Sequence, residues 1–228
     1  MSGSIPKEHN YNFEVDNGVL VSVAQDPLAK LGAGIGSTVW DAGLCLAGFA
    51  YAAQRHSRLS ISSIRNAIEL GAGTGIVGLA FSKLGAGRLI LTDVPNCLPL
   101  LQHNIDMNQQ SDKVQALPLT WGDRSHIDCI RSQISPDALD LIICSDLFAW
   151  PKLYKSLLAT ILEIAGPQTR VLMAYEERNT VQEGGFFRML HEHFVIREID
   201  PSLLHEEYRA SELHIFEAYR RQETEPQA

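Results

Sequence analysis

Glycine occupies every second position of residues 71–75, which read G-A-G-T-G and directly follow the largely apolar run 66–70. Apolar residues then recur at helical spacing from Ile76 onward, so the stretch predicts a strand, a glycine turn and a helix. Glycine accepts tight backbone angles and lets a ligand approach the main chain closely. The next apolar run ends in Asp93, where an acidic side chain can hold a pair of ribose hydroxyls. These residue types, in this order, predict a site for a nucleotide-like ligand.

Two classes of ligand compete for such a turn. A dinucleotide fingerprint requires a third glycine that closes the helix against the strand, and Ile76 stands at that position. The turn instead has the pattern G-x-G-x-G and is preceded by Glu69, whose carboxylate suits an ammonium group. This pattern resembles the first motif of the class I, seven-strand methyltransferases, which bind S-adenosylmethionine. That ligand carries an ammonium group where NAD carries a pyrophosphate, so the sequence favours the methyl donor.

From residue 66 onward, expected strands and helices alternate, which predicts parallel strands with helices on both faces of a sheet. Residues 119–137 are expected to form a loop, and the last two strands an antiparallel edge. The fold class is therefore α/β, a doubly wound and mostly parallel seven-strand sheet. The expected strands are 66–70, 88–92, 113–118, 138–144, 169–175, 194–199 and 213–219, and the expected helices of this part are 75–84, 96–108, 151–165 and 182–193.

The N-terminal part is predicted to add a β-hairpin and a helix. Asn17-Gly18 lies between two runs of alternating polarity, which is a strong hairpin signal, and residues 42–53 form an apolar helical stretch. The length of 228 residues argues for one domain with a small addition. We therefore expect residues 1–60 to be a hairpin and helix that pack on the core, and residues 61–228 to be the ligand-binding core.

Composition narrows the class of partner. With 45% hydrophobic and 20% charged residues, the chain is typical of a soluble globular protein. No apolar run approaches the ~20 residues that span a bilayer, so no membrane partner is expected. The net charge of −8 argues against nucleic acid, because phosphate binding needs a basic face.

Cysteine and histidine usage excludes further classes of site. The four cysteines lack C-x-x-C spacing, which indicates free thiols in a reducing compartment. The eight histidines form no metal-ligand pattern, and the chain has no G-x-S-x-G motif, so neither a metal site nor serine hydrolysis is expected. The expected location is the cytoplasm, extending to the nucleus, and the expected state is a monomer.

Ligands of an open parallel sheet bind beyond the carboxyl ends of its strands, so residues just after each strand carry the most information. Trp121 follows the third core strand and is either a core aromatic or a flat wall for adenine, and the adjacent Gly122 favours the wall. Asp146 follows the fourth strand and can equally cap the next helix or accept a hydrogen bond from a substrate amine. Trp40 opens an apolar helix, which by itself is more typical of a core residue.

Several segments together resemble one family, the seven-strand protein-lysine methyltransferases grouped as methyltransferase family 16. The resemblance extends from about Tyr11 to Tyr219 and implies a Rossmann-like methyltransferase fold. The glycine motif is common to all class I methyltransferases, whereas the V-W-D segment together with L-T-W-G is far more specific. The matching segments are G-S-T-V-W-D-A-G-L at 36–44, I-E-L-G-A-G-T-G at 68–75, L-T-W-G at 119–122 and Y-E-E-R at 175–178.

The resemblance carries the family's cofactor contacts to matching positions. Trp40 then contacts the methionine end of S-adenosylmethionine, which replaces its interpretation as a core residue. Residues 71–73 cradle the amino-acid moiety, Asp93 holds the ribose and Trp121 flanks the adenine. The full set of expected cofactor-binding residues is Trp40, Glu69, Gly71, Ala72, Gly73, Asp93, Trp121 and Ser145.

The resemblance also places the acceptor at the segment after the fourth strand. The family usually has an acid there, followed three positions later by Tyr or Phe, whereas this chain has Asp146 followed by Ala149. Asp146 is the catalytic candidate, expected to orient the amine. Phe148, Trp150 and Tyr175 are the candidates for an aromatic throat, which would lower the lysine pKa from about 10.4 by desolvation.

The sequence thus predicts an S-adenosylmethionine-dependent methyltransferase whose acceptor is a lysine side chain of another protein. Two alternatives remain. One is a small-molecule or N-terminal amine methyltransferase, because fold does not determine substrate. The other is a non-catalytic protein that binds the cofactor, for which the departure at residues 146–149 is the supporting observation.

Overall fold

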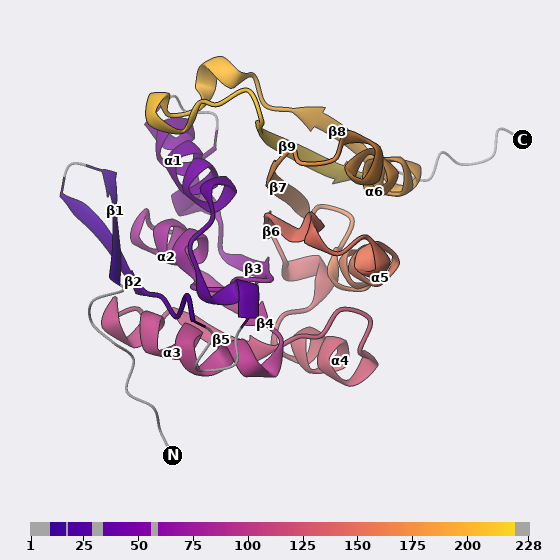
Figure 1. The fold of residues 1–228 in the computed structure, drawn as a ribbon. Coiled ribbons are helices and arrows are strands. Elements are labelled where there is room, and N and C mark those ends of the chain that lie inside the picture. The colour runs from indigo at the N-terminus through magenta and orange to yellow at the C-terminus, as the bar shows by residue number, and fades with distance from the viewer. Residues whose placement is uncertain (1–9, 17, 29–33, 56–58, 222–228) are drawn as a thin grey trace, which may run out of the picture.

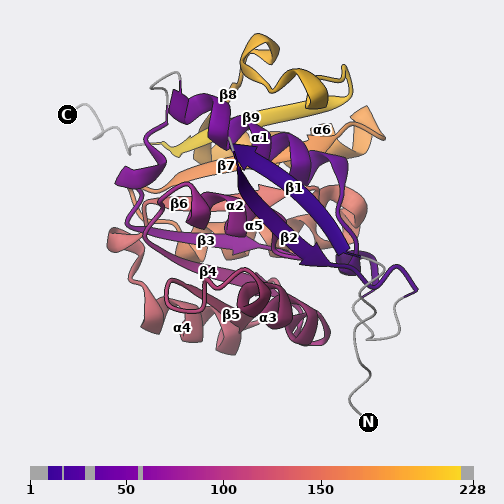
Figure 2. The ribbon, with the colours of Figure 1, turned by 90° about the vertical axis from the view of Figure 1, so that its left-hand side faces the viewer.

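The computed structural model describes residues 10–16, 18–28, 34–55 and 59–221. The expectations for Asn17 of the hairpin turn and for both chain ends lie outside the described residues. The described chain forms a twisted sheet with helices on both faces and a separate hairpin packed outside one helical layer (Figures 1 and 2).

The main sheet has the strand order β5-β4-β3-β6-β7-β9-β8. The first five strands of this order run parallel, and β9 runs antiparallel to both β7 and β8. The strand order reverses between β3 and β6, and such a switch point is where open α/β sheets bind ligands. The predicted seven-strand, doubly wound sheet is confirmed. The strands are β3 (Asn66–Leu70), β4 (Arg88–Asp93), β5 (Val114–Pro118), β6 (Leu141–Ser145), β7 (Arg170–Glu176), β8 (Phe194–Glu198) and β9 (Leu213–Arg220).

Two hydrophobic cores lie on opposite faces of this sheet. Neighbouring residues of one strand point to opposite faces, so Ala67 packs in one core while Ile68 and Leu70 pack in the other. Helices α1, α2 and α3 cover the first face, and α4, α5 and α6 cover the second (Figure 1). The helices are α1 (Asp41–Arg55), α2 (Ile76–Lys83), α3 (Leu98–Met107), α4 (Arg124–Gln133), α5 (Tyr154–Ile164) and α6 (Thr180–His193).

The N-terminal hairpin, β1 (Asn10–Asp16) and β2 (Val19–Ala24), is confirmed as an antiparallel pair. The buried side chains of the hairpin join the core of the first face. Asn104 of α3 also holds the hairpin by two hydrogen bonds. The Asn104 amide donates to the Ala24 carbonyl at 3.1 Å and accepts from the Ala24 amide at 2.8 Å. The hairpin is therefore an added layer on the helices rather than part of the main sheet. The division of the chain at residue 60 remains a prediction.

Helix α4 corrects the expectation of a loop over residues 119–137. Two side chains, Ile127 and Ile130, are buried on one face of this helix, and the remainder of the helix is largely polar. Asp123 caps it by accepting from the backbone N–H of His126 at 3.1 Å. Two apolar positions are too few to indicate a helical period. The feature of the sequence that could have indicated this helix is Asp123, a residue type that caps helices. None of the described helices is both long and apolar enough to cross a membrane.

Candidate active site

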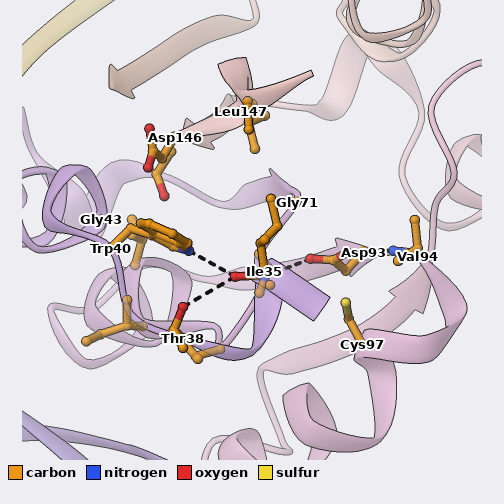
Figure 3. A pocket seen from close by; sticks show the side chains of 18 of the residues that line it. Ile35, Thr38, Trp40, Gly43, Gly71, Asp93, Val94, Cys97, Asp146 and Leu147 are labelled. Carbon is orange, nitrogen blue, oxygen red and sulfur yellow. Dashed lines mark hydrogen bonds between the residues drawn. The ribbon is translucent and has the colours of Figure 1, made fainter. Parts of the chain in front are cut away.

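One pocket lies beyond the carboxyl ends of β3, β4 and β6, at the switch point of the sheet. In Figure 3, Asp146 and Trp40 lie on one side of it, and Asp93 and Cys97 lie on the other. The pocket brings together the predicted catalytic residue and every predicted cofactor residue except Glu69. These pocket residues are Trp40, Gly71, Ala72, Gly73, Asp93, Trp121, Ser145 and Asp146.

The glycine turn requires glycine for two separate reasons. Gly71 and Gly73 have φ values of +61° and +55°, in the left-handed region that other residues rarely adopt. A Cβ at Gly73 would also lie 2.8 Å from the carbonyl oxygen of Gly36, and one at Gly71 would lie 2.6 Å from a methyl of Leu147. The turn is thus a cradle of bare backbone, which fits a ligand that contacts main-chain amides.

Asp93 has a second role that its position in the sequence did not reveal. One carboxylate oxygen accepts from the backbone N–H of Gly73 at 2.7 Å, and the other accepts from the N–H of Val94 at 2.7 Å. Burial raises the pKa of this carboxyl, while these two hydrogen bonds act in the opposite direction. Asp93 therefore fixes the glycine turn against the end of β4, and it also lines the pocket.

The structure corrects the role that the sequence predicts for Glu69. It is 1% exposed and does not line the pocket, so the expected contact with an ammonium group of the ligand is not formed from this position. Its carboxylate accepts from the backbone N–H of Gly78, in the first turn of α2, at 2.9 Å. The first N–H groups of a helix have no partner within the helix, and Glu69 provides one. Desolvation raises its pKa to about 8.

Two tryptophans form walls of the pocket. Trp121 lines it, and its ring lies 3.4 Å from the position that a Cβ of Gly71 would take. Trp40 is 41% exposed and also lines the pocket, so the interpretation of Trp40 as a core residue is wrong. The Trp40 indole donates to the carbonyl of Ile35 at 3.0 Å, which holds the ring at the mouth of the pocket (Figure 3).

Asp146 stands at the mouth in a left-handed conformation, with φ +54° and ψ +43°. Its side chain caps no helix, so the capping alternative is wrong. The carboxylate instead accepts two hydrogen bonds from the guanidinium of Arg178, at 2.8 and 2.9 Å. The Asp146 side chain is only 5% exposed. Arg178 ends the sequence motif Y-E-E-R, which by itself indicates no role for it, and the fold brings it to Asp146.

Comparison with known families decides which class this site belongs to. A family model described as lysine methyltransferase matches residues 26–193, which include the whole glycine turn, Asp93 and Asp146. The chain belongs to the lysine methyltransferase family. It is therefore an enzyme that methylates lysine side chains of proteins, as its sequence predicted.

Individual relatives of this lysine methyltransferase agree with the family assignment. The chain is 31% identical to EEF1A lysine methyltransferase 3 of Xenopus tropicalis over 188 residues, which are 82% of this chain and 76% of that protein. It is 29% identical to protein-lysine N-methyltransferase EFM6 of Saccharomyces cerevisiae, covering 82% of each. It is 27% identical to protein N-lysine methyltransferase METTL21A of Mus musculus, covering 84% of this chain and 81% of that protein.

Solved structures show the same fold at low sequence identity. The mitomycin 7-O-methyltransferase MmcR aligns with a TM-score of 0.56 and 16% identity, over 76% of this chain and 54% of that chain. The methyltransferase SMU.776, complexed with SAH, aligns with a TM-score of 0.57 and 14% identity, over 96% of this chain and 58% of that chain. These similarities confirm the Rossmann-like fold of the lysine methyltransferase.

The expected aromatic throat of the methyltransferase is only partly present. Phe148 and Tyr175 are 8% and 6% exposed, pack against each other in the second core and do not line the pocket. Trp150 is 47% exposed and does line it. Helix α6 covers the ring of Phe148 with Phe186, a tertiary contact that local spacing could not reveal. The aromatic side chains at the mouth are therefore Trp40 and Trp150.

The structure contains no group of metal ligands in the ranges that it describes: no three His, Cys, Asp or Glu side chains are grouped so as to hold a metal ion. The pocket of this methyltransferase is lined by the backbone of the glycine turn, by the indole rings of three tryptophans and by the carboxylates of Asp93 and Asp146.

Proposed function

We propose that this lysine methyltransferase binds S-adenosylmethionine at the glycine turn and methylates a protein lysine that enters past Asp146, with EEF1A as the first acceptor to test. The observation that carries the proposal is the single pocket shared by the glycine turn, Asp93 and Asp146. The EEF1A acceptor is taken from the name of a relative that is 31% identical.

The roles proposed for the cofactor side follow from the groups that face the pocket. Bare backbone at Gly71–Gly73 suits the amino-acid moiety, and the Asp93 carboxylate suits the ribose hydroxyls. The indole of Trp121 offers a flat surface for adenine. Trp40 lies on the same side of the pocket as Asp146 (Figure 3), and Ser145 directly precedes Asp146 in the chain, so both suit the methionine end. Glu69 is left out of this set, because its carboxylate links β3 to the first turn of α2.

The reaction needs alignment, exclusion of water and a neutral amine. S-adenosylmethionine, when bound, supplies a methyl group already activated by a sulfonium. The acceptor ammonium first gives a proton to water, because only a free lone pair can attack. The amine nitrogen then forms a bond to the methyl carbon while the carbon–sulfur bond breaks, and the electron pair of that bond stays on sulfur. Holding the amine in line with that bond is the main contribution of the protein.

Asp146 and the two exposed tryptophans are suited to that task. The carboxylate accepts a hydrogen bond from the amine and directs its lone pair toward the glycine turn. Trp40 and Trp150 reduce the access of water to the amine, and desolvation favours the neutral form of lysine. The departure from the family at Ala149 places the ring of Trp150 one position later along the chain.

The test supplies the purified chain with methyl-labelled S-adenosylmethionine and, separately, purified EEF1A, a cell lysate and its small-molecule fraction. We expect label on a protein lysine, located by mass spectrometry, and EEF1A among the labelled proteins. Label only in the small-molecule fraction or on protein N-termini would overturn the lysine acceptor. Cofactor binding in calorimetry without any transfer would overturn the catalytic role. Label on proteins other than EEF1A would overturn only the proposed acceptor.

A further inference from the structure

Arg178 connects three elements at the mouth of the pocket. It lies in the loop between β7 and α6 and pairs with Asp146 at the end of β6. It also pairs with Glu176 at the end of β7, at 2.5 Å. Its guanidinium carbon lies 5.6 Å from the ring centroid of Trp40, just before α1, within the range of a cation–π contact. One side chain thus touches both the catalytic candidate and a wall of the pocket.

Hydrogen bonds also fix the backbone at Arg178. Its N–H donates to a carboxylate oxygen of Glu183 at 3.0 Å, and the N–H of Asn179 donates to the same oxygen at 3.1 Å. Asn179 caps α6 by accepting from the N–H of Gln182 at 3.1 Å. The start of α6 therefore fixes the backbone from which the Arg178 side chain extends, and the two ion pairs hold the guanidinium itself.

The charges at this point partly cancel. Asp146 and Glu176 contribute one negative charge each and Arg178 contributes one positive charge, so the group carries a net charge of −1. A carboxylate as buried as that of Asp146 needs a paired charge, and a bidentate guanidinium is the strongest such partner. The two ion pairs also raise the pKa of Arg178, so its charge persists at any working pH.

An unpaired carboxylate would work against the reaction. It would attract a lysine ammonium and stabilise the protonated form, which has no lone pair with which to attack. A carboxylate whose charge is offset still has lone pairs that accept a hydrogen bond from a neutral amine. The bidentate pair leaves such lone pairs on Asp146, which lines the pocket.

We propose that Arg178 is a positioning residue of the transfer reaction: it fixes the Asp146 carboxylate at the pocket and offsets its charge, so that Asp146 orients the acceptor amine without trapping it as an ammonium. The proposal rests on the proposed function of lysine methylation.

Other charged groups lie on the surrounding elements. Glu183 of α6 directs its carboxylate to backbone N–H groups. Lys152 lies over the ring of Trp150, with its nitrogen 5.6 Å from the centroid. Asp41 lies at the start of α1 and Glu177 directly follows Glu176, and the Coulomb interactions that act on Arg178 come from Asp146 and Glu176.

The test measures methyl transfer against pH with the acceptor protein that the wild-type chain labels most strongly, beginning with purified EEF1A. Arg178→Gln should move the midpoint of the pH–rate profile about one unit upward, so its loss of rate at pH 7 should be about tenfold larger than its loss at high pH, where only the effect of the lost bidentate geometry remains. The KM for the acceptor should stay the same or fall, since the ammonium binds better. Affinity for S-adenosylhomocysteine, measured by calorimetry, should change less than about threefold.

Two further variants separate charge from shape. Glu176→Gln removes a negative charge from Arg178 and should move the midpoint about half a unit downward, opposite to Arg178→Gln. Arg178→Lys keeps the charge but loses the bidentate geometry, so its midpoint should return to that of the wild type while the rate stays low at every pH. Arg188→Gln is the matched control, because Arg188 is an exposed arginine of α6 without an ion pair among the described residues.

The outcomes distinguish failure of the proposed lysine methylation from failure of the role of Arg178 alone. No transfer by the wild-type chain at any pH, with cofactor binding intact, would overturn the proposed function and this inference with it. Transfer by the wild type together with an equal loss at every pH in Arg178→Gln would overturn this inference alone. A gain of transfer at neutral pH in Arg178→Gln would also overturn it, because Arg178 would then be blocking the carboxylate. If Arg178→Gln does not fold, the downward shift in Glu176→Gln still decides the matter.

Discussion

The glycine turn and the mouth of the pocket are built from different parts of the chain. The turn is a contiguous stretch of backbone between β3 and α2, shaped by positive φ angles and held by Asp93, while Glu69 links β3 to α2. The mouth is formed by side chains of Trp40, Asp146 and Arg178, which come from three distant elements. The backbone of the turn lies so close to its neighbours that an added side chain would clash. The side chains at the mouth are partly exposed, so substitutions there should alter function by degrees. Changes in the turn should therefore abolish binding, and changes at the mouth should alter the rate.

The largest effect is expected at the turn itself. Gly73→Val places a branched side chain at a φ of +55° and within 2.8 Å of the Gly36 carbonyl oxygen, so S-adenosylhomocysteine affinity should fall more than about 100-fold. Calorimetry on the folded variant measures this. Gly85→Val is the matched control, since Gly85 also has a positive φ, +102°, but its Cβ would meet nothing closer than 3.7 Å. Retained affinity in Gly73→Val would show that the ligand does not lie on the turn.

The next effect is expected at Asp93, which both holds the turn and lines the pocket. Asp93→Ala removes the acceptor of two backbone hydrogen bonds and the proposed partner of the ribose, so affinity should fall about 100-fold, or about 2.7 kcal/mol. Circular dichroism should show the fold intact. Asp112→Ala removes an exposed acid away from the pocket and should leave affinity unchanged. Equal affinities in the two variants would contradict the role of Asp93.

At the mouth, Asp146→Asn should separate rate from binding. Affinity for S-adenosylhomocysteine should stay within about twofold, while methyl transfer falls at least about tenfold, a loss of about 1.4 kcal/mol at the transition state. The physical reason is that asparagine keeps the shape of aspartate but forms a weaker, uncharged hydrogen bond to the amine. If cofactor affinity falls with the rate, the two halves of the pocket are not independent.

The smallest effect on S-adenosylhomocysteine binding is expected at Glu69, which is buried and does not line the pocket. Its folded pKa of about 8 lies above the ordinary value of 4.5, so between these pH values the carboxyl is protonated when folded and ionised when unfolded. The folded state then binds the extra proton, and the free energy of unfolding falls as pH rises, by at most about 1.4 kcal/mol per pH unit. Glu69→Gln mimics the neutral form and should remove this slope in denaturant titrations between pH 5 and 8, with affinity within about twofold. An unchanged slope would show that Glu69 is ionised in the folded chain.

Much of the framework could be predicted from residue order. The apolar runs of β3 and β4 and the helical spacing after Gly75 are local patterns, and each corresponds to an observed element. Helix α4 was missed because only Ile127 and Ile130 face the core, and a pattern of two positions has no measurable period. The family segments supplied Trp40 and Ser145, which local patterns alone would have left in the core or without a role.

The sequence by itself determined the order of the strands and of the helices other than α4, the glycine turn and the acid at the end of β4. These depend on backbone angles and on periods of a few residues, which neighbouring side chains impose locally. Only the tertiary structure decided where carboxylates point. Glu69 turns toward α2 and Asp146 toward Arg178, because a buried charge or polar group must find its partner wherever the packed elements place one. Such partners lie far apart in the chain, at a separation of 32 residues for Asp146 and Arg178, and only the folded sheet brings them within hydrogen-bonding distance.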